Sequence, residues 1–77
     1  MKSLEEFIEL FIEQFDETDA SEITATTAFH DLEEYSSLIA LSIIAMVDEE
    51  FDVALKGDDM RSAVTVEDLY YIVKNKA

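Results

Sequence analysis

Residues 37–51 read Ser-Leu-Ile-Ala-Leu-Ser-Ile-Ile-Ala-Met-Val-Asp-Glu-Glu-Phe, the most informative helical pattern in the chain. On a helix, successive residues lie about 100° apart around the axis. One broad face would then be apolar, and we expect it to form core: Ala40, Ile43, Ile44, Val47 and Phe51, with Leu41 and Ala45 at its edge. The opposite side carries Leu38, Ile39, Ser42, Met46, Glu49 and Glu50. Apolar side chains among acids on an outer face predict either a cover of neighbouring loops or a surface that docks a partner.

Two other segments have the pattern of amphipathic helices. In residues 3–15, apolar residues recur with helical spacing: Leu4, Phe7, Ile8, Phe11, Ile12 and Phe15. Ser3, with Glu6 three residues later, has the spacing of a capping box. Thr65 and Asp68 repeat this spacing at the start of a last helix, whose apolar stripe is Val66, Leu69, Tyr70 and Val73.

The connecting segments differ in length. Residues 16–36 show no sustained period, and we expect this long connection to be pinned by three apolar residues: Ile23, Phe29 and Leu32. Residues 52–56 form a loop that ends at Gly57, and residues 58–61 predict one short helical turn. The predicted fold is an all-α, four-helix bundle, with three main helices, a short third helix and a long first loop. We expect residues 1–77 to form a single domain.

Composition excludes several classes of function. The 77 residues contain 19 Asp and Glu against five Lys and Arg, a formal net charge of −14, which argues against binding nucleic acid because phosphate contacts use Lys and Arg. The absence of Cys excludes disulfides, thiolate metal sites and a Cys nucleophile. No signal peptide is recognised, and the longest apolar stretch, residues 38–47, is far shorter than the roughly 20 residues that span a bilayer. We therefore expect a monomeric, cytoplasmic protein without membrane insertion.

The sequence gives little support for catalysis or metal binding. His30 is the only His, and a lone His in a polar loop is more often a bystander than a base. No carboxylate occupies an obviously apolar pocket that would raise its pKa for acid–base chemistry. Residues 52–57 have an oxygen ligand only at the first position of a calcium loop. We expect neither an enzyme nor a metal site.

Ser36 and Ser37, at the head of the second helix, allow two interpretations. In the first, one of the hydroxyls only caps the helix by accepting a hydrogen bond from a free backbone N–H. In the second, a Ser carries a phosphate ester, because the free N–H groups and the dipole of a helix N-terminus stabilise an anion. The second interpretation makes a Ser here a suitable attachment point for a phosphodiester-linked group.

The chain resembles the acyl carrier protein family over roughly residues 4–74. The resemblance rests on Phe29-x-x-Leu32, on Ser37-Leu38 opening an apolar helix that ends Asp48-Glu49-Glu50-Phe51-Asp52, on Gly57-Asp58-Asp59-Met60, and on Thr65-Val66-Glu67-Asp68-Leu69. It implies that Ser37 carries a 4′-phosphopantetheine arm, which a phosphopantetheinyl transferase adds from coenzyme A. It also implies that the arm holds acyl groups as thioesters for fatty-acid, polyketide-like or related biosynthesis.

The resemblance further implies roles for two sets of residues. Acyl-transferring or condensing enzymes with basic patches would dock on Leu38, Ile39, Met46, Asp48, Glu49 and Glu50. The acyl chain would lie among Ile44, Val47, Phe51, Leu55, Met60 and Ala63, although ordinary core is an equally good interpretation of each of these residues.

Three departures from the family pattern concern the segment around Ser37. The usual Asp before the Ser is replaced by Ser36, the segment between Leu32 and Ser37 is one residue longer, and Ser42 stands where an acidic residue is common. These changes suggest a specialised carrier serving a dedicated acyl pathway. The missing Asp also motivates an alternative, in which the chain is an acidic helical interaction module that keeps the carrier fold without the arm.

Overall fold

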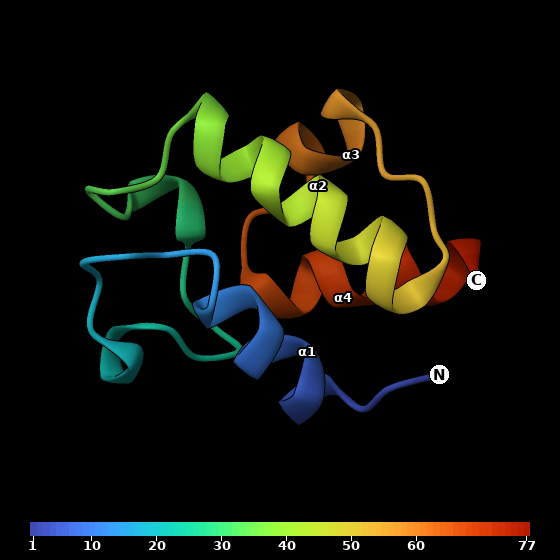
Figure 1. Cartoon of the computed structure of the whole chain (residues 1–77), viewed down its shortest axis with the longest axis horizontal. Helices are drawn as coiled ribbons and strands as arrows, with labels where there is room; N and C mark the ends of the chain where they lie inside the picture. The colour runs from blue at the N-terminus through green and yellow to red at the C-terminus, as the bar shows by residue number, and fades with distance from the viewer.

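The computed structural model describes residues 1–77 and contains four α-helices and no β-strand. The helices are α1 (Leu4–Ile12), α2 (Ser37–Phe51), α3 (Gly57–Ser62) and α4 (Val66–Lys76). Two single 3₁₀ turns, η1 (Ala20–Glu22) and η2 (Phe29–Asp31), lie in the connection between α1 and α2. Figure 1 shows α2 crossing the molecule above α4, with short α3 at its upper side and α1 below. The predicted all-α, four-helix architecture is confirmed.

Side-chain caps set the helix starts that the sequence predicts. The Ser3 hydroxyl accepts from the N–H of Glu6 at 3.2 Å, and the Glu6 carboxylate accepts from the N–H of Ser3 at 3.2 Å. Thr65 and Asp68 form the same reciprocal pair at α4. The first helix is shorter than predicted, because after Ile12 the chain enters tight turns in which the N–H of Phe15 bonds to the oxygen of Ile12 at 3.0 Å.

Aromatic rings form the centre of the core. Phe7 and Phe11 of α1 are fully buried. The ring of Phe7 lies 5.5 Å from that of Tyr70 on α4, and the ring of Phe11 lies 5.5 Å from that of Phe29 in η2. Phe29 in turn packs edge-on against Tyr35, with centroids 5.3 Å apart. This continuous contact fixes the segment before α2 against the helices, so the position of Tyr35 is set by the core.

The long first connection is held by both its side chains and its backbone. Ile23 and Phe29 are buried and Leu32 is half-buried, which confirms the three predicted anchors. The oxygens of Thr27 and Ala25 accept hydrogen bonds from the N–H groups of Val66 and Glu67, at 3.2 and 2.9 Å. Backbone N–H groups in the first turn of a helix have no intrahelical partner. The connection therefore satisfies the first turn of α4 and is tied to it.

The buried face of α2 differs from the predicted one. The residues buried on this helix are Ile39, Ile43, Met46 and Val47, whereas Ala40, Ile44 and Phe51 are only half-buried. Met46 and Leu10 of α1 line the same shallow hollow between the two helices. The apolar residues of α2 occupy most of its circumference, so its own pattern does not orient it. Packing against α1 orients the helix so that Ile39 and Met46 face the core.

Candidate functional site

The two serines at the start of α2 have different environments. The Ser36 hydroxyl caps the helix, accepting from the N–H of Ile39 at 3.4 Å, and the Ser36 carbonyl accepts from the N–H of Ala40 at 2.9 Å. Ser37 is the first residue of the helix, its side chain is exposed, and its hydroxyl takes no part in the cap. The geometry therefore separates the two interpretations of this pair, because Ser36 does the capping and Ser37 has a free hydroxyl.

A groove of about 440 Å³ begins at Ser37 and lies between α2 and α3. On the α2 side it is lined by Ser37, Ala40, Leu41 and Ile44. On the α3 side it is lined by Gly57, Met60 and Arg61. His30 and Tyr35, from the segment before α2, complete the lining. The free hydroxyl of Ser37 thus lies at a partly apolar groove whose length follows α2.

The predicted acyl-pocket residues fall into two groups. Ile44 and Met60 line the groove. Val47, Leu55 and Ala63 are closed inside the core, with exposed fractions of 0%, 6% and 1%, and Phe51 packs against α1 through Phe7. None of these four residues lines a cavity of the structure. The sequence pattern missed the polar part of the lining, which comes from His30, Tyr35 and Arg61.

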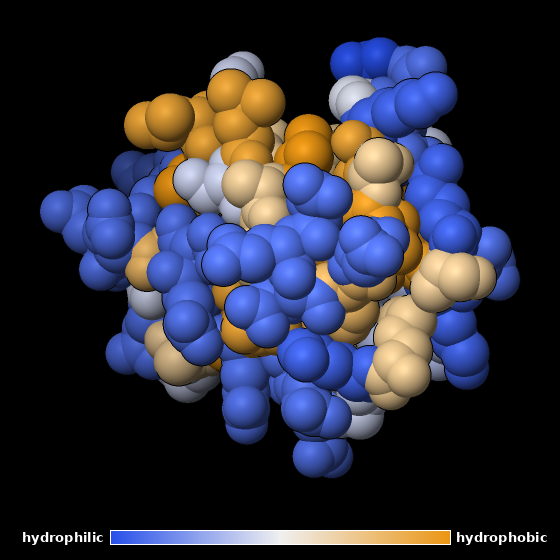
Figure 2. Space-filling model, turned by 45° about the vertical axis from the view of Figure 1, so that its right-hand side comes forward, coloured by the Kyte–Doolittle hydropathy of each residue, from blue (hydrophilic) through white to orange (hydrophobic).

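An exposed stripe on α2 lies beside the groove. It consists of Leu38, Leu41, Ala45, Asp48 and Glu49, and we call it the α2 stripe. Leu38 is 73% exposed and Leu41 is 61% exposed, although leucine is among the residue types most often buried. Figure 2 shows apolar residues gathered at the upper edge of the molecule, at the level where α2 begins, above a mostly hydrophilic surface.

The stripe corrects part of the predicted docking surface. Leu38, Asp48 and Glu49 are exposed as predicted. Ile39 and Met46 are buried, with exposed fractions of 9% and 6%, so the prediction that these two side chains face outward is wrong. Glu50 is exposed but lies toward the N-terminal segment, 3.9 Å from the Lys2 ammonium. Leu41, which the pattern placed at the edge of the core, takes the outer position because the helix is turned.

Residues 5–70 match the family model described as the phosphopantetheine attachment site. The chain belongs to this family. The comparisons with curated proteins and with solved structures gave no match.

Domains of this phosphopantetheine-attachment family carry 4′-phosphopantetheine covalently, and they are carriers and not enzymes. They interact with a phosphopantetheinyl transferase and with acyl-processing enzymes. The residues of this carrier fit such a group, because an exposed, uncommitted hydroxyl stands at a helix N-terminus beside a groove. When bound, the group supplies a terminal thiol that holds an acyl group as a thioester.

His30, which the sequence predicts to be a bystander, has a structural role in this carrier. Its Nε2 atom lies 2.9 Å from the backbone oxygen of Met60 and 3.0 Å from that of Ala63. Since carbonyl oxygens only accept, Nε2 carries the hydrogen and donates it to both. The ring also stacks on Phe29 and meets Tyr35 edge-on, with centroids 4.4 and 5.0 Å away. His30 therefore fastens the C-terminal end of α3 to η2.

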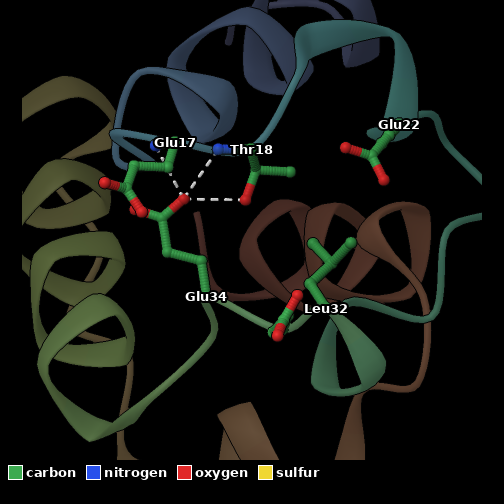
Figure 3. Close-up of a pocket in the computed structure, with 6 residues that line it drawn as sticks. Glu17, Thr18, Glu22, Leu32 and Glu34 are labelled. Carbon is green, nitrogen blue, oxygen red and sulfur yellow. Dashed lines mark hydrogen bonds between the residues drawn. The ribbon is translucent and has the colours of Figure 1, made fainter.

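Glu34 ties the connection of the carrier together. Its carboxylate accepts from the N–H groups of Asp16, Glu17 and Thr18 at 2.6, 2.9 and 2.8 Å, and from the Thr18 hydroxyl at 2.7 Å. Figure 3 shows this carboxylate turned toward Glu17 and Thr18, with Glu22 standing apart. These bonds, led by the one from Asp16, lower the pKa of the Glu34 carboxyl from 4.5 to about 2.

An acidic hollow lies around Glu34. It measures about 390 Å³ and has four carboxylates in its lining: Glu17, Glu22, Glu33 and Glu34. Nevertheless, no group of three or more side chains in the structure is arranged to hold a metal ion. The Glu34 oxygens are already used by backbone donors. In addition, no helix of the carrier has both the length and the apolar character needed to cross a membrane.

Proposed function

We propose that the Ser37 hydroxyl is the attachment point of 4′-phosphopantetheine and that this domain carries acyl intermediates to the enzymes that process them. The observation that carries the proposal is the difference between the two serines. The Ser36 hydroxyl caps the helix, whereas the Ser37 hydroxyl is exposed beside the groove. The family match supports an attachment site in this chain, and the geometry favours Ser37 as its position.

The start of α2 favours a phosphodiester at Ser37. The N–H groups of Ser37 and Leu38 precede the first intrahelical bonds and have no partner in the protein. These groups, with the dipole of a 15-residue helix, stabilise an anion placed at its N-terminus. This local effect matters in a chain of net charge −14, because the rest of the molecule repels a phosphate.

The attachment reaction needs a base that this chain does not supply. The Ser37 oxygen attacks the pyrophosphate phosphorus of coenzyme A that bears the pantetheine arm. An oxygen–phosphorus bond forms, the pyrophosphate bond breaks, and adenosine 3′,5′-bisphosphate leaves. No side chain of the protein hydrogen-bonds the Ser37 hydroxyl, so its proton goes to a base of the transferase. The carrier contributes an accessible nucleophile and a site for the product anion.

The α2 stripe is the surface that we assign to partner enzymes. Its leucines supply an apolar centre, and Asp48 and Glu49 supply negative charge at one end. A partner with an apolar contact surrounded by Lys and Arg complements this arrangement, and the opposite charges speed the encounter. We expect the domain to act as a monomer in a fatty-acid, polyketide-like or related acyl pathway.

Intact mass spectrometry tests the attachment site. The protein is incubated with coenzyme A and a broad-specificity phosphopantetheinyl transferase, and we expect a mass gain of one phosphopantetheinyl group. Ser37→Ala should abolish the gain and Ser36→Ala should preserve it. If the mass gain is lost only in Ser36→Ala, the group is attached to Ser36 and the assignment to Ser37 is wrong. No gain in any form, together with partner binding through Leu38 and Leu41, would favour the interaction module without an arm.

A further inference from the structure

The first turn of α2 contains no acidic residue, although the first turns of α1 and α4 contain two each. In a chain with 19 acids, this arrangement keeps negative side chains away from the phosphodiester proposed at Ser37. It also removes the reciprocal cap found on α1 and α4, because the residue three positions after Ser36 is Ile39 and not a Glu or Asp. The start of α2 therefore lacks one of the bonds that hold the other two helix starts.

The cap that remains at the start of α2 is weak. The N–H of Ile39 lies 3.4 Å from the Ser36 hydroxyl oxygen, beyond the usual range of about 2.7–3.2 Å for such a bond. Helix ends held by few bonds fray. The position of the Ser37 hydroxyl, which no side chain holds, therefore depends on how the residues before it are fixed.

Glu34 supplies the first of two anchors before α2. Its carboxylate accepts hydrogen bonds from the N–H groups of Asp16, Glu17 and Thr18 and from the Thr18 hydroxyl, all at 2.6–2.9 Å, and we call this arrangement the Glu34 clasp (Figure 3). These bonds, led by the one from Asp16, lower the pKa of the Glu34 carboxyl to about 2, so the group is charged at neutral pH. Charged acceptors form the stronger hydrogen bonds.

The residues that bind Glu34 are themselves held on both sides. Phe15, directly before them, is buried in the core with an exposed fraction of 7%. Asp19, directly after them, caps η1, where its carboxylate accepts from the N–H of Ser21 at 2.8 Å. Residues 16–18 are thus fixed between a core side chain and a capped turn. The clasp therefore ties Glu34 to the body of the fold.

Tyr35 is the second anchor, and it attaches to a different part of the molecule. Its ring packs edge-on against Phe29 and His30 of η2, with centroids 5.3 and 5.0 Å away. Glu34 and Tyr35 thus hold consecutive residues to the turn after α1 and to η2. Only one residue separates Tyr35 from Ser37. Two anchors on separate elements leave the chain little freedom at this point, and together they set where the Ser37 hydroxyl stands.

We propose that the Glu34 clasp holds Ser37 in place for the phosphopantetheinyl transferase, which makes Glu34 a positioning residue of the attachment reaction. The inference rests on the proposed function of Ser37. The clasp takes over the task of a reciprocal cap, and it does so without a charged side chain beside the phosphodiester. When only a fraction of a protein is in the binding-competent conformation, its apparent affinity falls by that fraction. Loss of the clasp should therefore weaken binding to the transferase and leave the chemical step unchanged.

Transferase kinetics on the whole chain test the role of Glu34. The carrier concentration is varied at saturating coenzyme A, at a temperature where circular dichroism shows each variant folded. Glu34→Gln should raise the KM for the carrier by about threefold to tenfold, the cost of ordering roughly one side chain, with kcat unchanged. Thr18→Val removes one of the four bonds and should raise KM by less. The control Glu33→Gln removes the same charge outside the clasp and should keep the KM of the parent protein.

Amide hydrogen exchange measures the positioning without the transferase. The amide of Ala40 bonds to the Ser36 oxygen at 2.9 Å, and its exchange reports opening of the start of α2. The amide of Leu69 bonds to the Thr65 oxygen in α4, and its exchange reports the general loss of stability. In Glu34→Gln, exchange should accelerate by a larger factor at Ala40 than at Leu69. Equal factors at the two amides would overturn the inference.

Salt separates the clasp from a direct contact between Glu34 and the transferase. The ratio of KM between Glu34→Gln and the parent protein should stay constant from about 0.05 M to about 0.3 M NaCl, because the clasp lies within the carrier. A ratio that falls toward one would assign Glu34 to the docking contact and overturn the positioning role. An unchanged KM in Glu34→Gln would also overturn it and leave Ser37 as the attachment point. Failure to load the parent protein at Ser37 would instead remove the proposed function, and this inference with it.

Discussion

The Nε2 atom of His30 lies 2.9 Å from the backbone oxygen of Met60, joining a residue of the first connection to one in α3. The same nitrogen lies 3.0 Å from the oxygen of Ala63. These two oxygens belong to the end of a helix of only six residues. A helix this short is not stable by itself, and it depends on tertiary contacts. The position of α3, and with it one wall of the groove, therefore depends on His30.

Replacing His30 by Ala should destabilise the fold by about 1–2 kcal/mol, because two carbonyl oxygens lose their donor and the stacked ring is removed. Urea unfolding measures the effect. His30→Gln, which keeps an amide donor, should recover part of the loss. Asp31→Ala, an exposed neighbour in η2, is the matched control and should change little. Equal stability of His30→Ala and the parent protein would show that α3 is held by other contacts.

Glu34 should make the stability of the fold depend on pH in the acid range. Its pKa in the folded state is about 2 against an ordinary 4.5, so the folded carboxylate is favoured over the protonated form. The stabilisation is therefore fully present above pH 4.5 and is lost as the pH falls from about 4.5 to about 2. Between these values, the melting temperature of the parent protein should fall toward that of Glu34→Gln.

The comparison between the parent protein and Glu34→Gln also removes the general effect of acid. Protonation of other carboxylates changes the net charge in both proteins alike, so the difference between their melting temperatures isolates Glu34. Glu33→Gln removes the same charge from an exposed neighbour that makes none of these bonds, so it controls for the change in net charge and should not show the loss assigned to Glu34. A constant difference from pH 7 to pH 2 would contradict the role of the charged carboxylate.

Self-repulsion should make the fold sensitive to salt. The net charge is −14, and only three ion pairs connect the few cations to acids. Raising ionic strength from about 0.01 M to about 0.15 M shortens the screening length from about 30 Å to about 8 Å. The melting temperature should therefore rise with NaCl, and Glu9→Gln, which removes a solvated charge on α1, should reduce the response. A flat response would mean that the acids are already well separated.

The features that the sequence predicted correctly depend on neighbours in the chain. Ser3 and Glu6 are three residues apart, as are Thr65 and Asp68, and a cap of this kind forms from local geometry alone. The anchors Ile23 and Phe29 stood out because they are isolated apolar residues in a polar segment. The sequence left open which of Ser36 and Ser37 caps α2, and only the position at which the helix begins separates the two hydroxyls.

The features that the sequence did not predict depend on distant partners. His30 bonds to oxygens 30 and 33 positions along the chain, and Glu34 bonds to Thr18, 16 positions before it. The orientation of α2 depends on α1, because a helix that is apolar around most of its circumference has no face of its own to bury. For this reason Leu41, which was predicted to lie at the edge of the core, is exposed, and Met46, which was predicted to face outward, is buried.

The exchange of Leu41 and Met46 leads to opposite mutational effects. Met46 is 6% exposed, so Met46→Ala should cost about 2–5 kcal/mol of stability by leaving a cavity beside α1. Leu41 is 61% exposed, so Leu41→Ala should change the free energy of unfolding by less than about 0.5 kcal/mol. In transferase assays, Leu41→Ala should lower kcat/KM, because it removes part of the apolar centre of the α2 stripe.

Ala45→Ser is the matched control for Leu41→Ala, since it changes the same stripe without removing a large side chain. It should leave both stability and kcat/KM nearly unchanged. Activity at a temperature where each variant is fully folded, verified by circular dichroism, separates docking from unfolding. If Leu41→Ala unfolds as readily as Met46→Ala, then Leu41 belongs to the core and the stripe is not the surface that partners contact. If it stays folded and loses kcat/KM, then the outer leucines of α2 take part in docking because the helix is turned toward Met46.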